Sequence, residues 1–434
     1  MSPGDAPERS TGPTRRQPRG QSRPTHVARQ CHRAALCFHG GMAEFFASTD
    51  PIQGYAWGSR SVLARMQSRE VPSPEPEAEL WIGSHPSGPS RLSVDGREEP
   101  LDEILERDPA RVLGERAEAL RDGELPFLLK ILAIDAPLSI QVHPSPEQAE
   151  EGWQREEAEG IDHQAANRNY KDRSAKPEIG VAVTRVETLS GVRSRAELAV
   201  LAEALDQQWL RDVLATGLPV LPSVLQLPEA EARVALTDLL SAVDRLPTHD
   251  ELGAMLRYIA GRHPGDRGLL VALCMNHVVL EPGEAIFTPA GQLHAYLRGT
   301  AVEMMACSDN VLRAGLTPKH IDVDELLELV TPEQANTDPI DAPAGPDGLR
   351  RYPLWDERLS LVSATVEGGA GTRLPESTCV VLCTDGAVEL TAGPGGSEAP
   401  SYELSAGHSV WCRTDGSELG VKGAGTVFAV GLTA

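Results

Sequence analysis

Two stretches of the chain alternate short apolar runs with Pro and Gly, and the stretch between them has helical spacing. From Ala43 to about residue 192, and again from Gly268, runs such as PFLLKILAIDAPLSIQVHP and GLLVALCMNHVVLEPGEAIF are typical of short strands joined by turns. Between 193 and 266, segments such as SRAELAVLAEALDQQWL and PEAEARVALTDLL carry apolar residues three and four positions apart. The pattern predicts strands interrupted by a helical insertion.

The C-terminal part of the chain returns to strand texture. A Pro-, Gly- and Asp-rich linker at 331–348 precedes short strands such as RLSLVSATV and TCVVLCT, and many short strands with even turn spacing favour a jelly roll. We expect a mainly β protein with two jelly rolls and a helical insertion. The expected boundaries are 43–192 and 267–335 for the first jelly roll, 193–266 for the insertion and 336–434 for the second jelly roll.

The first 41 residues have a different character. They hold seven Arg among several Pro and Gly, and they lack the apolar run of a signal peptide. We expect residues 1–41 to be a basic, disordered leader and Met42 to be the functional start.

Charge and cysteine usage narrow the function classes. The 434 residues contain 63 acidic and 40 basic side chains, a formal charge of −23, which repels nucleic-acid backbones. No run approaches the ~20 apolar residues of a membrane helix. The seven cysteines form no CxxC pair, which is typical of free thiols in a reducing cytoplasm. We expect a cytoplasmic monomer without nucleic-acid or membrane partners.

One hairpin carries a metal signal. Gly283, Pro289, Gly291 and His294 have the spacing G-x5-P-x-G-x2-H, which is the second half of the cupin motif, where a hairpin presents one His to a metal. Arg298 stands where that motif usually has Asn. The half-motif alone also occurs in barrels without a metal.

Two further segments offer ligands at strand spacing. In SIQVH, the residues Ser139, Gln141 and His143 share one face of a strand while Ile140 and Val142 point the other way. In KPEI, Lys176 and Glu178 share a face in the same manner. Taken alone, the first pattern also fits an outer polar face, and the second fits a surface ion pair.

A fourth segment, EMMACSDNVLRAGLTPK, begins at Glu303 within apolar sequence. A buried carboxylate there needs a partner or a raised pKa. Gln141, His143, Glu178 and His294 together supply an amide oxygen, two imidazoles and one carboxylate. This set suits a divalent ion such as Zn²⁺ and leaves the metal net positive, as a Lewis acid requires.

The motifs resemble those of type I mannose-6-phosphate isomerases, which are zinc-dependent enzymes of the cupin superfamily. The resemblance is carried by YAWGS, AELWIGSHPSGPS, QVHP, KPE, the PGEAIF-TPAG-LHAYL hairpin and EMMACSDNVLRAGLTPK, in family order from about residue 54 to 319. It implies that Gln141, His143, Glu178 and His294 bind one zinc ion. It also places around the substrate the residues Lys130, Ser139, Lys176, Glu303, Asp309 and Arg313.

The resemblance implies reversible interconversion of mannose 6-phosphate and fructose 6-phosphate by proton transfer between C1 and C2 through an enediolate. Glu303 is our candidate base and Asp309 its competitor. Arg313 stabilises the enediolate or holds the phosphate, and Lys130 and Lys176 add positive charge. Ala175 stands where many family members have His before KPE, so no role of that His carries over to this chain.

Two other functions use the same ligands. A cupin oxygenase would bind iron, although its usual His-rich set differs from this one, and a non-catalytic cupin would only bind a sugar phosphate. In the second jelly roll, His408 of SAGHSVWCR lies in a similar hairpin, but no His, Glu or Gln stands at ligand spacing from it. We therefore expect that region to be structural.

Overall fold

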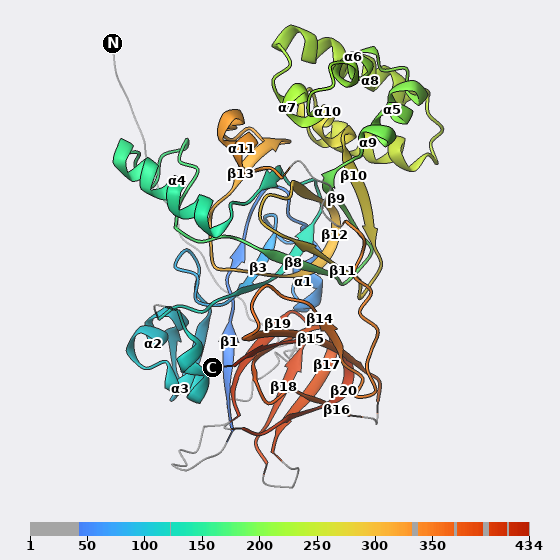
Figure 1. Ribbon diagram of the computed structural model, residues 1–434. Helices are drawn as coiled ribbons and strands as arrows, with labels where there is room; N and C mark the ends of the chain where they lie inside the picture. Colours follow the sequence, from blue (N-terminus) through green and yellow to red (C-terminus); the bar gives the residue numbers. More distant parts are fainter. Residues whose placement is uncertain are drawn as a thin grey trace, which may run out of the picture. The chain divides into compact units, whose positions relative to one another are not determined.

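The computed structural model (Figure 1) describes residues 43–433 apart from 122, 332–336, 369–370, 394–398 and 415. The described residues belong to one unit. The expected leader and Met42 lie outside the described residues.

The first of two large antiparallel sheets contains every strand that bears a predicted ligand. Strand β12 is its long central member, and its two halves have different partners. Its first half pairs with β7 and β9, and its second half pairs with β6 and β8. The strands of this sheet are β2 (Ile52–Gln53), β3 (Glu79–Ile82), β6 (Leu128–Ile134), β7 (Ile140–Val142), β8 (Glu178–Ala182), β9 (Val186–Val192), β10 (Met275–Leu280), β11 (Ala285–Thr288), β12 (His294–Met305) and β13 (Leu312–Gly315).

The division of β12 occurs at Gly299. Its φ is +119°, and a Cβ atom there would lie 2.6 Å from the carbonyl oxygen of Arg185. Only glycine allows this backbone conformation and close approach. The bend places His294 and Glu303 of one strand in two different parts of the sheet.

The second sheet is built mostly from the C-terminal residues, but the first described strand joins it. Strand β1 pairs with β19 on one side and with β4 on the other. Its members are β1 (Glu44–Thr49), β4 (Arg91–Val94), β5 (Arg97–Pro100), β14 (Arg350–Tyr352), β15 (Leu359–Val366), β16 (Thr372–Leu374), β17 (Thr378–Ala392), β18 (Ser401–Ser405), β19 (His408–Arg413) and β20 (Leu419–Leu432).

The residues between β9 and β10 form helices, as their spacing predicts. Ser194 begins the first of them with a capping box to Glu197, and Asp250 caps α9. Their apolar faces meet in one core with Leu293, just before β12, and Ala295 of β12. The helices are α5 (Arg195–Ala204), α6 (Gln208–Ala215), α7 (Val220–Leu225), α8 (Glu229–Arg245), α9 (Glu251–Arg262) and α10 (Gly268–Leu273).

The strand expectation from Gly268 was wrong for its first six residues, which form α10. All six are buried, and a short apolar run that is buried on every side shows no periodicity that separates helix from strand. Strand structure resumes at Met275, in β10.

Several helices interrupt the regions in which the pattern predicts strands. The longest of them, α4, begins at a Ser145–Gln148 capping box, but its sequence PEQAEEGWQREEAE has almost no apolar stripe. Its polar composition explains why periodicity gave no signal. These helices are α1 (Val62–Met66), α2 (Leu101–Arg107), α3 (Ala110–Leu113), a 3₁₀ helix (Gly114–Ala119), α4 (Pro146–Glu159) and α11 (Val323–Leu329).

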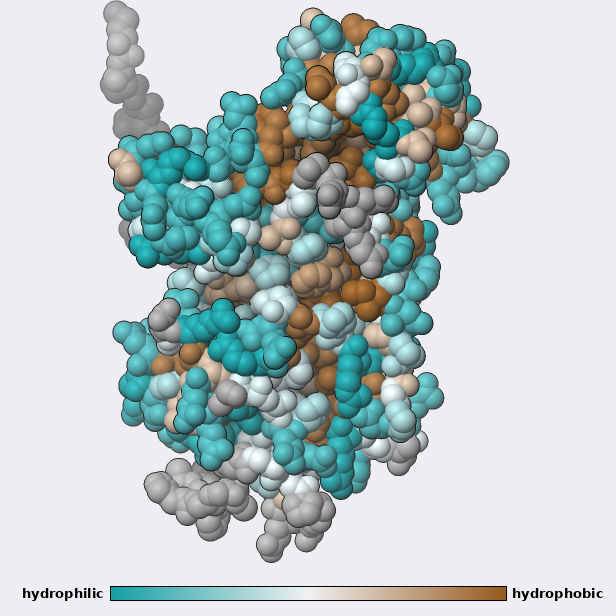
Figure 2. Space-filling model, viewed as in Figure 1, coloured by the Kyte–Doolittle hydropathy of each residue, from teal (hydrophilic) through white to brown (hydrophobic). Residues whose placement is uncertain are grey.

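Polar side chains cover most of the face drawn in Figure 2, especially over α4, and apolar residues gather near the junction of the helices α5–α10 with the strands. Within the described ranges, no helix is long and apolar enough to cross a membrane.

Candidate metal centre and substrate pocket

Cross-strand pairing aligns three of the predicted site residues. Gln141 of β7 lies opposite His294 of β12 on one side and opposite Arg313 of β13 on the other. Residues directly opposite in antiparallel strands share a face of the sheet. Gln141, His294 and Arg313 therefore form one row, and Ser190 of β9 extends it beyond His294.

The three charged or imidazole ligands of the predicted set converge. The ligand atoms of His143, Glu178 and His294 all lie within 4.8 Å of one another, and all three residues are buried. Nε2 of His143 is 3.3 Å from Glu178 Oε1, and Nε2 of His294 is 3.4 Å from Glu178 Oε2. This arrangement is open to one small cation at the centre of the three.

The hydrogen bonds of the two imidazoles fix which nitrogen faces that centre. Nδ1 of His143 donates to the carbonyl oxygen of Asn310 at 2.7 Å, and Nδ1 of His294 donates to that of Gln292 at 3.1 Å. Each Nε2 is buried and has no hydrogen-bond partner among the described residues. Neutral imidazoles held through Nδ1–H in this way are typical of metal ligands.

The charges in the cluster favour the protonation states that a metal requires. Burial, assisted by the Lys176 ammonium, lowers the pKa of His143 to about 4, so the ring is neutral at pH 7. Burial alone would raise the pKa of Glu178, but Lys176, 2.7 Å away, and His143 outweigh it and hold that pKa well below its usual value. Glu178 is therefore ionised, and it forms a buried ion pair with Lys176.

A second group of charges lies beside the first on β3, β6 and β12. The ammonium of Lys130 is 3.2 Å from Glu79 Oε2 and 3.4 Å from Glu303 Oε2, and all three side chains are buried. Burial opposes the charge of Lys130, yet the carboxylates around it raise its pKa above the usual value. Lys130 is thus a permanent cation, held between Glu79 and Glu303.

Glu303 has the properties of a proton carrier. Burial and the nearby charge of Glu178 raise its pKa to about 7, against the opposing effects of Lys130 and Lys176. A carboxyl group with a pKa near neutrality both accepts and releases a proton readily. Asp309 differs, because its hydrogen bond with His85 lowers its pKa and half of its side chain is exposed.

Arg313 and two further cations, Lys319 and Lys171, lie toward the surface. The guanidinium of Arg313 is within ion-pair distance of no carboxylate in the part of the chain that the structure describes, and burial lowers its pKa. Burial and the charge of Arg313 likewise lower the pKa of Lys319, and burial followed by Arg168 lowers that of Lys171. Cations gathered without a carboxylate partner in a protein of this net charge are suited to bind an anion.

Sequence reasoning missed several residues of this pocket. Glu79 and Trp81 alternate on β3, so a strand period within AELWIGS could have revealed the Glu79 carboxylate. Tyr296 follows His294 at the same strand period, and its buried hydroxyl has no hydrogen-bond partner among the described residues. A Cβ atom at Gly180 would lie 2.0 Å from that hydroxyl, so glycine is required where the ring ends.

Comparisons with known proteins agree with this geometry. A family model described as phosphomannose isomerase type I, catalytic domain, matches residues 46–195. The mannose-6-phosphate isomerase of Escherichia coli (strain K12) is 37% identical over 392 residues, which cover 87% of this chain and 97% of that protein. The mannose-6-phosphate isomerase of Mus musculus is 31% identical over 394 residues, which cover 81% and 90%.

Solved structures give the same result for the fold. A zinc-bound mannose 6-phosphate isomerase superposes with a TM-score of 0.80 and 33% identity, covering 90% of this chain and all of that chain. A variant of the phosphomannose isomerase from Salmonella typhimurium superposes with a TM-score of 0.81 and 32% identity over the same shares. The expectation of a mainly β architecture is confirmed by the two large sheets, and these neighbours show that the fold is that of phosphomannose isomerases.

Proposed function

The chain belongs to the type I phosphomannose isomerase family, and from this premise we propose that it interconverts mannose 6-phosphate and fructose 6-phosphate. The observation that carries the proposal is the position of a buried His143–Glu178–His294 cluster beside the buried Lys130–Glu303 pair. An aldose–ketose isomerase needs a polarising cation at the sugar oxygens and a base near C1 and C2. The two groups supply these requirements side by side.

Zinc is the metal that the residues fit. Two imidazoles with unpartnered Nε2 atoms, the ionised Glu178 and the amide of Gln141 opposite His294 offer four ligands of the types that Zn²⁺ prefers. We propose that these four residues hold one zinc ion, which when bound supplies Lewis-acid polarisation of the substrate's carbonyl and hydroxyl oxygens. With one formal negative charge among the ligands, the centre stays net positive.

We propose Glu303 as the base that moves the proton between C1 and C2 of the open-chain sugar. Its raised pKa keeps the carboxylate basic, and Lys130 holds it in position. Asp309 is less suited, because its pKa is lowered and its carboxylate is half exposed. Lys130 and Lys176 remain near the reacting carbons, where their charges favour the enediolate as it forms.

Arg313 and Lys319 are better suited to bind the phosphate than Lys130 and Lys176. Lys130 and Lys176 are already paired with buried carboxylates, whereas Arg313 and Lys319 are not paired with any described carboxylate. We propose that Arg313 and Lys319 bind the phosphate, with Ser139, just before β7, as a hydroxyl donor. A planar guanidinium donates to two phosphate oxygens at once. Arg313 also lies opposite Gln141, a proposed zinc ligand, so we propose that it reaches the developing enediolate as well.

We further propose that the enzyme acts as a monomer in the cytoplasm. The described cysteines, Cys274, Cys307, Cys379, Cys383 and Cys412, are all free thiols, which fits a reducing compartment. The boundaries given above for the two jelly rolls and the insertion stay part of the proposal.

Turnover with controlled zinc tests the function. The rate of fructose 6-phosphate formation from mannose 6-phosphate should fall to background after removal of the metal by a chelator and return on addition of one equivalent of Zn²⁺. An iron-dependent oxygen uptake with no isomer formed would instead support the oxygenase. Sugar-phosphate binding without turnover, in folded and zinc-loaded protein, would support the non-catalytic cupin.

A further inference from the structure

A single asparagine, Asn310, connects the His143 ligand to the loop that leads into the Lys176–Glu178 segment. It lies two residues before β13 and is completely buried. We propose that Asn310 is a positioning residue, whose side chain holds its own backbone carbonyl against His143 and thereby fixes that imidazole for zinc. The inference rests on the zinc site of the proposed function.

The backbone of Asn310 sets the orientation of the ligand. Its carbonyl oxygen accepts the Nδ1–H of His143 at 2.7 Å. This bond selects the tautomer with a free Nε2 and restricts rotation of the ring, so Nε2 faces Glu178 and His294. Partners of this kind make a bound imidazole more basic and reduce the entropy lost on metal binding.

The side chain of Asn310 holds the residue in place by filling all four of its hydrogen-bonding positions. Its Oδ1 accepts from the backbone N–H groups of Lys171 at 2.7 Å and Asp172 at 3.2 Å. Its Nδ2 donates to the carbonyl oxygens of Asp172 at 2.8 Å and Ser174 at 2.9 Å. A buried amide satisfied on both sides bridges two chain segments rigidly.

The same two segments are bound a second time through Asp172. Its carboxylate accepts from the hydroxyl of Ser308 at 2.9 Å and from the backbone N–H of Asp309 at 2.8 Å. Side chains of 308–310 therefore bond to the backbone of 171–174, and the Asp172 side chain bonds back to 308 and 309. The Asn310 amide makes most of these contacts and belongs to the same residue as the carbonyl that touches the ligand.

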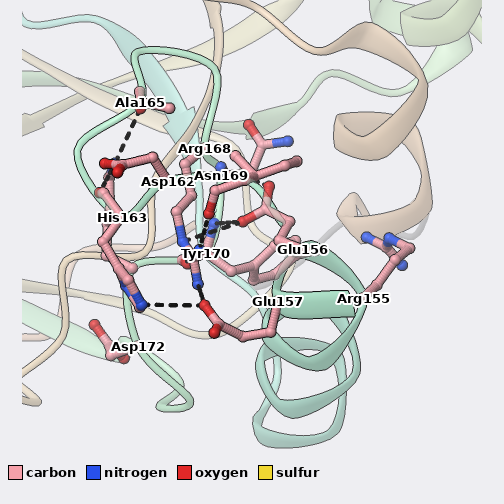
Figure 3. Close-up of polar contacts among 12 residues, drawn as sticks. Arg155, Glu156, Glu157, Asp162, His163, Ala165, Arg168, Asn169, Tyr170 and Asp172 are labelled. Atoms are coloured by element: carbon pink, nitrogen blue, oxygen red, sulfur yellow. Dashed lines mark hydrogen bonds and ion pairs between the residues drawn. The ribbon is translucent and has the colours of Figure 1, made fainter. Parts of the chain in front are cut away.

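The loop is in turn anchored on α4, so it is a firm support. Figure 3 shows Glu156 and Glu157 of α4 turned toward Arg168 and the backbone of Asn169 and Tyr170. The Glu156 carboxylate accepts from the N–H groups of Asn169 and Tyr170 at 2.8 and 2.9 Å. The completely buried Arg168 guanidinium donates to the carbonyl of Tyr170 and to Glu157.

The consequence is specific. Without the Asn310 amide, residue 310 loses its own hydrogen bonds to the loop, and the contacts of Ser308 and Asp309 with Asp172 remain. The carbonyl that orients His143 is then less restrained. Zinc binding should weaken, while the sugar-binding and proton-carrying groups stay chemically intact. Loss of such outer partners typically costs 10–100-fold in metal affinity or activity.

The test compares Asn310→Ala with Asn169→Ala. Both changes remove a side-chain amide that bonds to a segment far away in the chain, but the amide of Asn169 donates to Asp322 and that of Asn310 bonds to residues 171–174. Zinc affinity is measured on metal-free protein by competition with a chromophoric chelator, and the ligand field is read from the absorption spectrum of the Co²⁺-substituted protein. We expect N310A to bind zinc 10–100-fold more weakly and to shift the Co²⁺ bands, and N169A to match the wild type in both.

A positioning role also predicts rescue. At zinc concentrations that saturate N310A, kcat should recover to within about tenfold of the wild type, because no atom of the side chain touches the reacting groups. A zinc affinity within twofold of the wild type would overturn the proposal, as would a kcat that stays down by 10³-fold or more at saturating zinc. Should N310A not fold, Asn310→Ser loses less volume and is held to the same two criteria.

The zinc and cobalt readouts need no substrate. A wild-type protein that binds zinc but does not convert mannose 6-phosphate would contradict the proposed function and leave this inference standing. Conversely, normal turnover with unchanged zinc affinity in N310A would refute the inference alone.

Discussion

The two β regions of this protein each present a histidine at the start of a strand that follows a turn glycine, and only one of them lies in a cluster of ligands. His294 follows Gly291 by three residues and begins β12, and His408 directly follows Gly407 and begins β19. His294 is buried and lies opposite Gln141 and Ser190. His408 is exposed and lies opposite Cys383 in an apolar strand.

The neighbours of each hairpin account for the difference. The sheet that bears His294 also carries Glu178, Glu303 and Lys130, and Lys176 lies just before β8. The burial of these charges is tolerated because each has an opposite charge within 3.4 Å. The strands around His408 contribute a core of Val, Leu, Ala and Cys side chains. Both hairpins position a histidine. Only near His294 do buried, paired charges on neighbouring strands add the further ligands that a metal needs.

Replacing His294 or His408 by alanine, one at a time, should give the largest difference in activity between the two regions. His294→Ala removes a ligand and should reduce isomerase activity at least 10³-fold, on the order of 4 kcal/mol or more, with loss of tight zinc binding. His408→Ala should leave activity and zinc content unchanged. Zinc content is measured by metal analysis after dialysis, and rates by formation of fructose 6-phosphate. A zinc-free but active H294A, or a zinc-depleted H408A, would break the comparison.

Arginine side chains should show the same asymmetry between the two regions. Arg313→Ala should lower kcat/KM by about 10²–10³-fold with zinc content unchanged, because in the proposed mechanism it removes a preorganised cation at the phosphate or the enediolate. Arg373→Ala is the matched control, since Arg373 is exposed and forms an ion pair with Glu418. Steady-state kinetics on zinc-saturated protein distinguishes them. Turnover of R313A at the wild-type rate would remove Arg313 from the mechanism.

Truncating a core side chain of the C-terminal region should have the opposite effect, because it should lower stability and leave zinc binding unchanged. Leu390 is completely buried in the apolar core of the C-terminal region. Leu390→Ala should reduce the free energy of unfolding by about 3 kcal/mol through lost burial and a residual cavity. The zinc affinity of the folded variant should match that of the wild type. Denaturant unfolding and zinc competition measure the two quantities, and a tenfold change in zinc affinity would show that the regions are not separable.

The buried carboxyl group of Glu303 should make the free energy of unfolding depend on pH. Glu303 has a pKa of about 7 in the folded protein and an ordinary value of 4.5 when unfolded. Between these values the folded state holds more protons at this site, so the stability it contributes is complete below pH 4.5 and is lost as the pH rises through 7. The stability difference between metal-free wild type and Glu303→Gln should fall by about 3 kcal/mol from pH 4.5 to 8.

An exposed carboxylate of the C-terminal region provides the control for this measurement. Glu389 on β17 is exposed, so Glu389→Gln should give a stability difference from the wild type that is flat over the same pH range. A flat profile for E303Q as well would mean that the Glu303 carboxyl group is not protonated in the folded protein near neutral pH.

The sequence predicted those parts of the site that follow strand period or family motifs. The alternation of Gln141 with His143, and of Lys176 with Glu178, needed only a period of two to place them on common faces. The hairpin at Gly283–His294 predicted one ligand, and the order of the motifs identified the family.

Other parts depend on contacts between segments far apart in the chain. The Glu79–Lys130–Glu303 group joins three strands, and no local pattern shows which strands become neighbours. Asn310 gains its role from residues 136 to 167 positions away. The helix α10 was missed because a buried apolar run has no polar face to reveal its period.

Proton NMR of the zinc-loaded enzyme with fructose 6-phosphate in D₂O tests the central claim most directly, with a chelated sample as control. The account predicts that mannose 6-phosphate forms only in the presence of zinc and carries deuterium at C2, because the proton moves through a carboxyl group that exchanges with solvent. No mannose 6-phosphate from folded, zinc-bound protein would contradict the account.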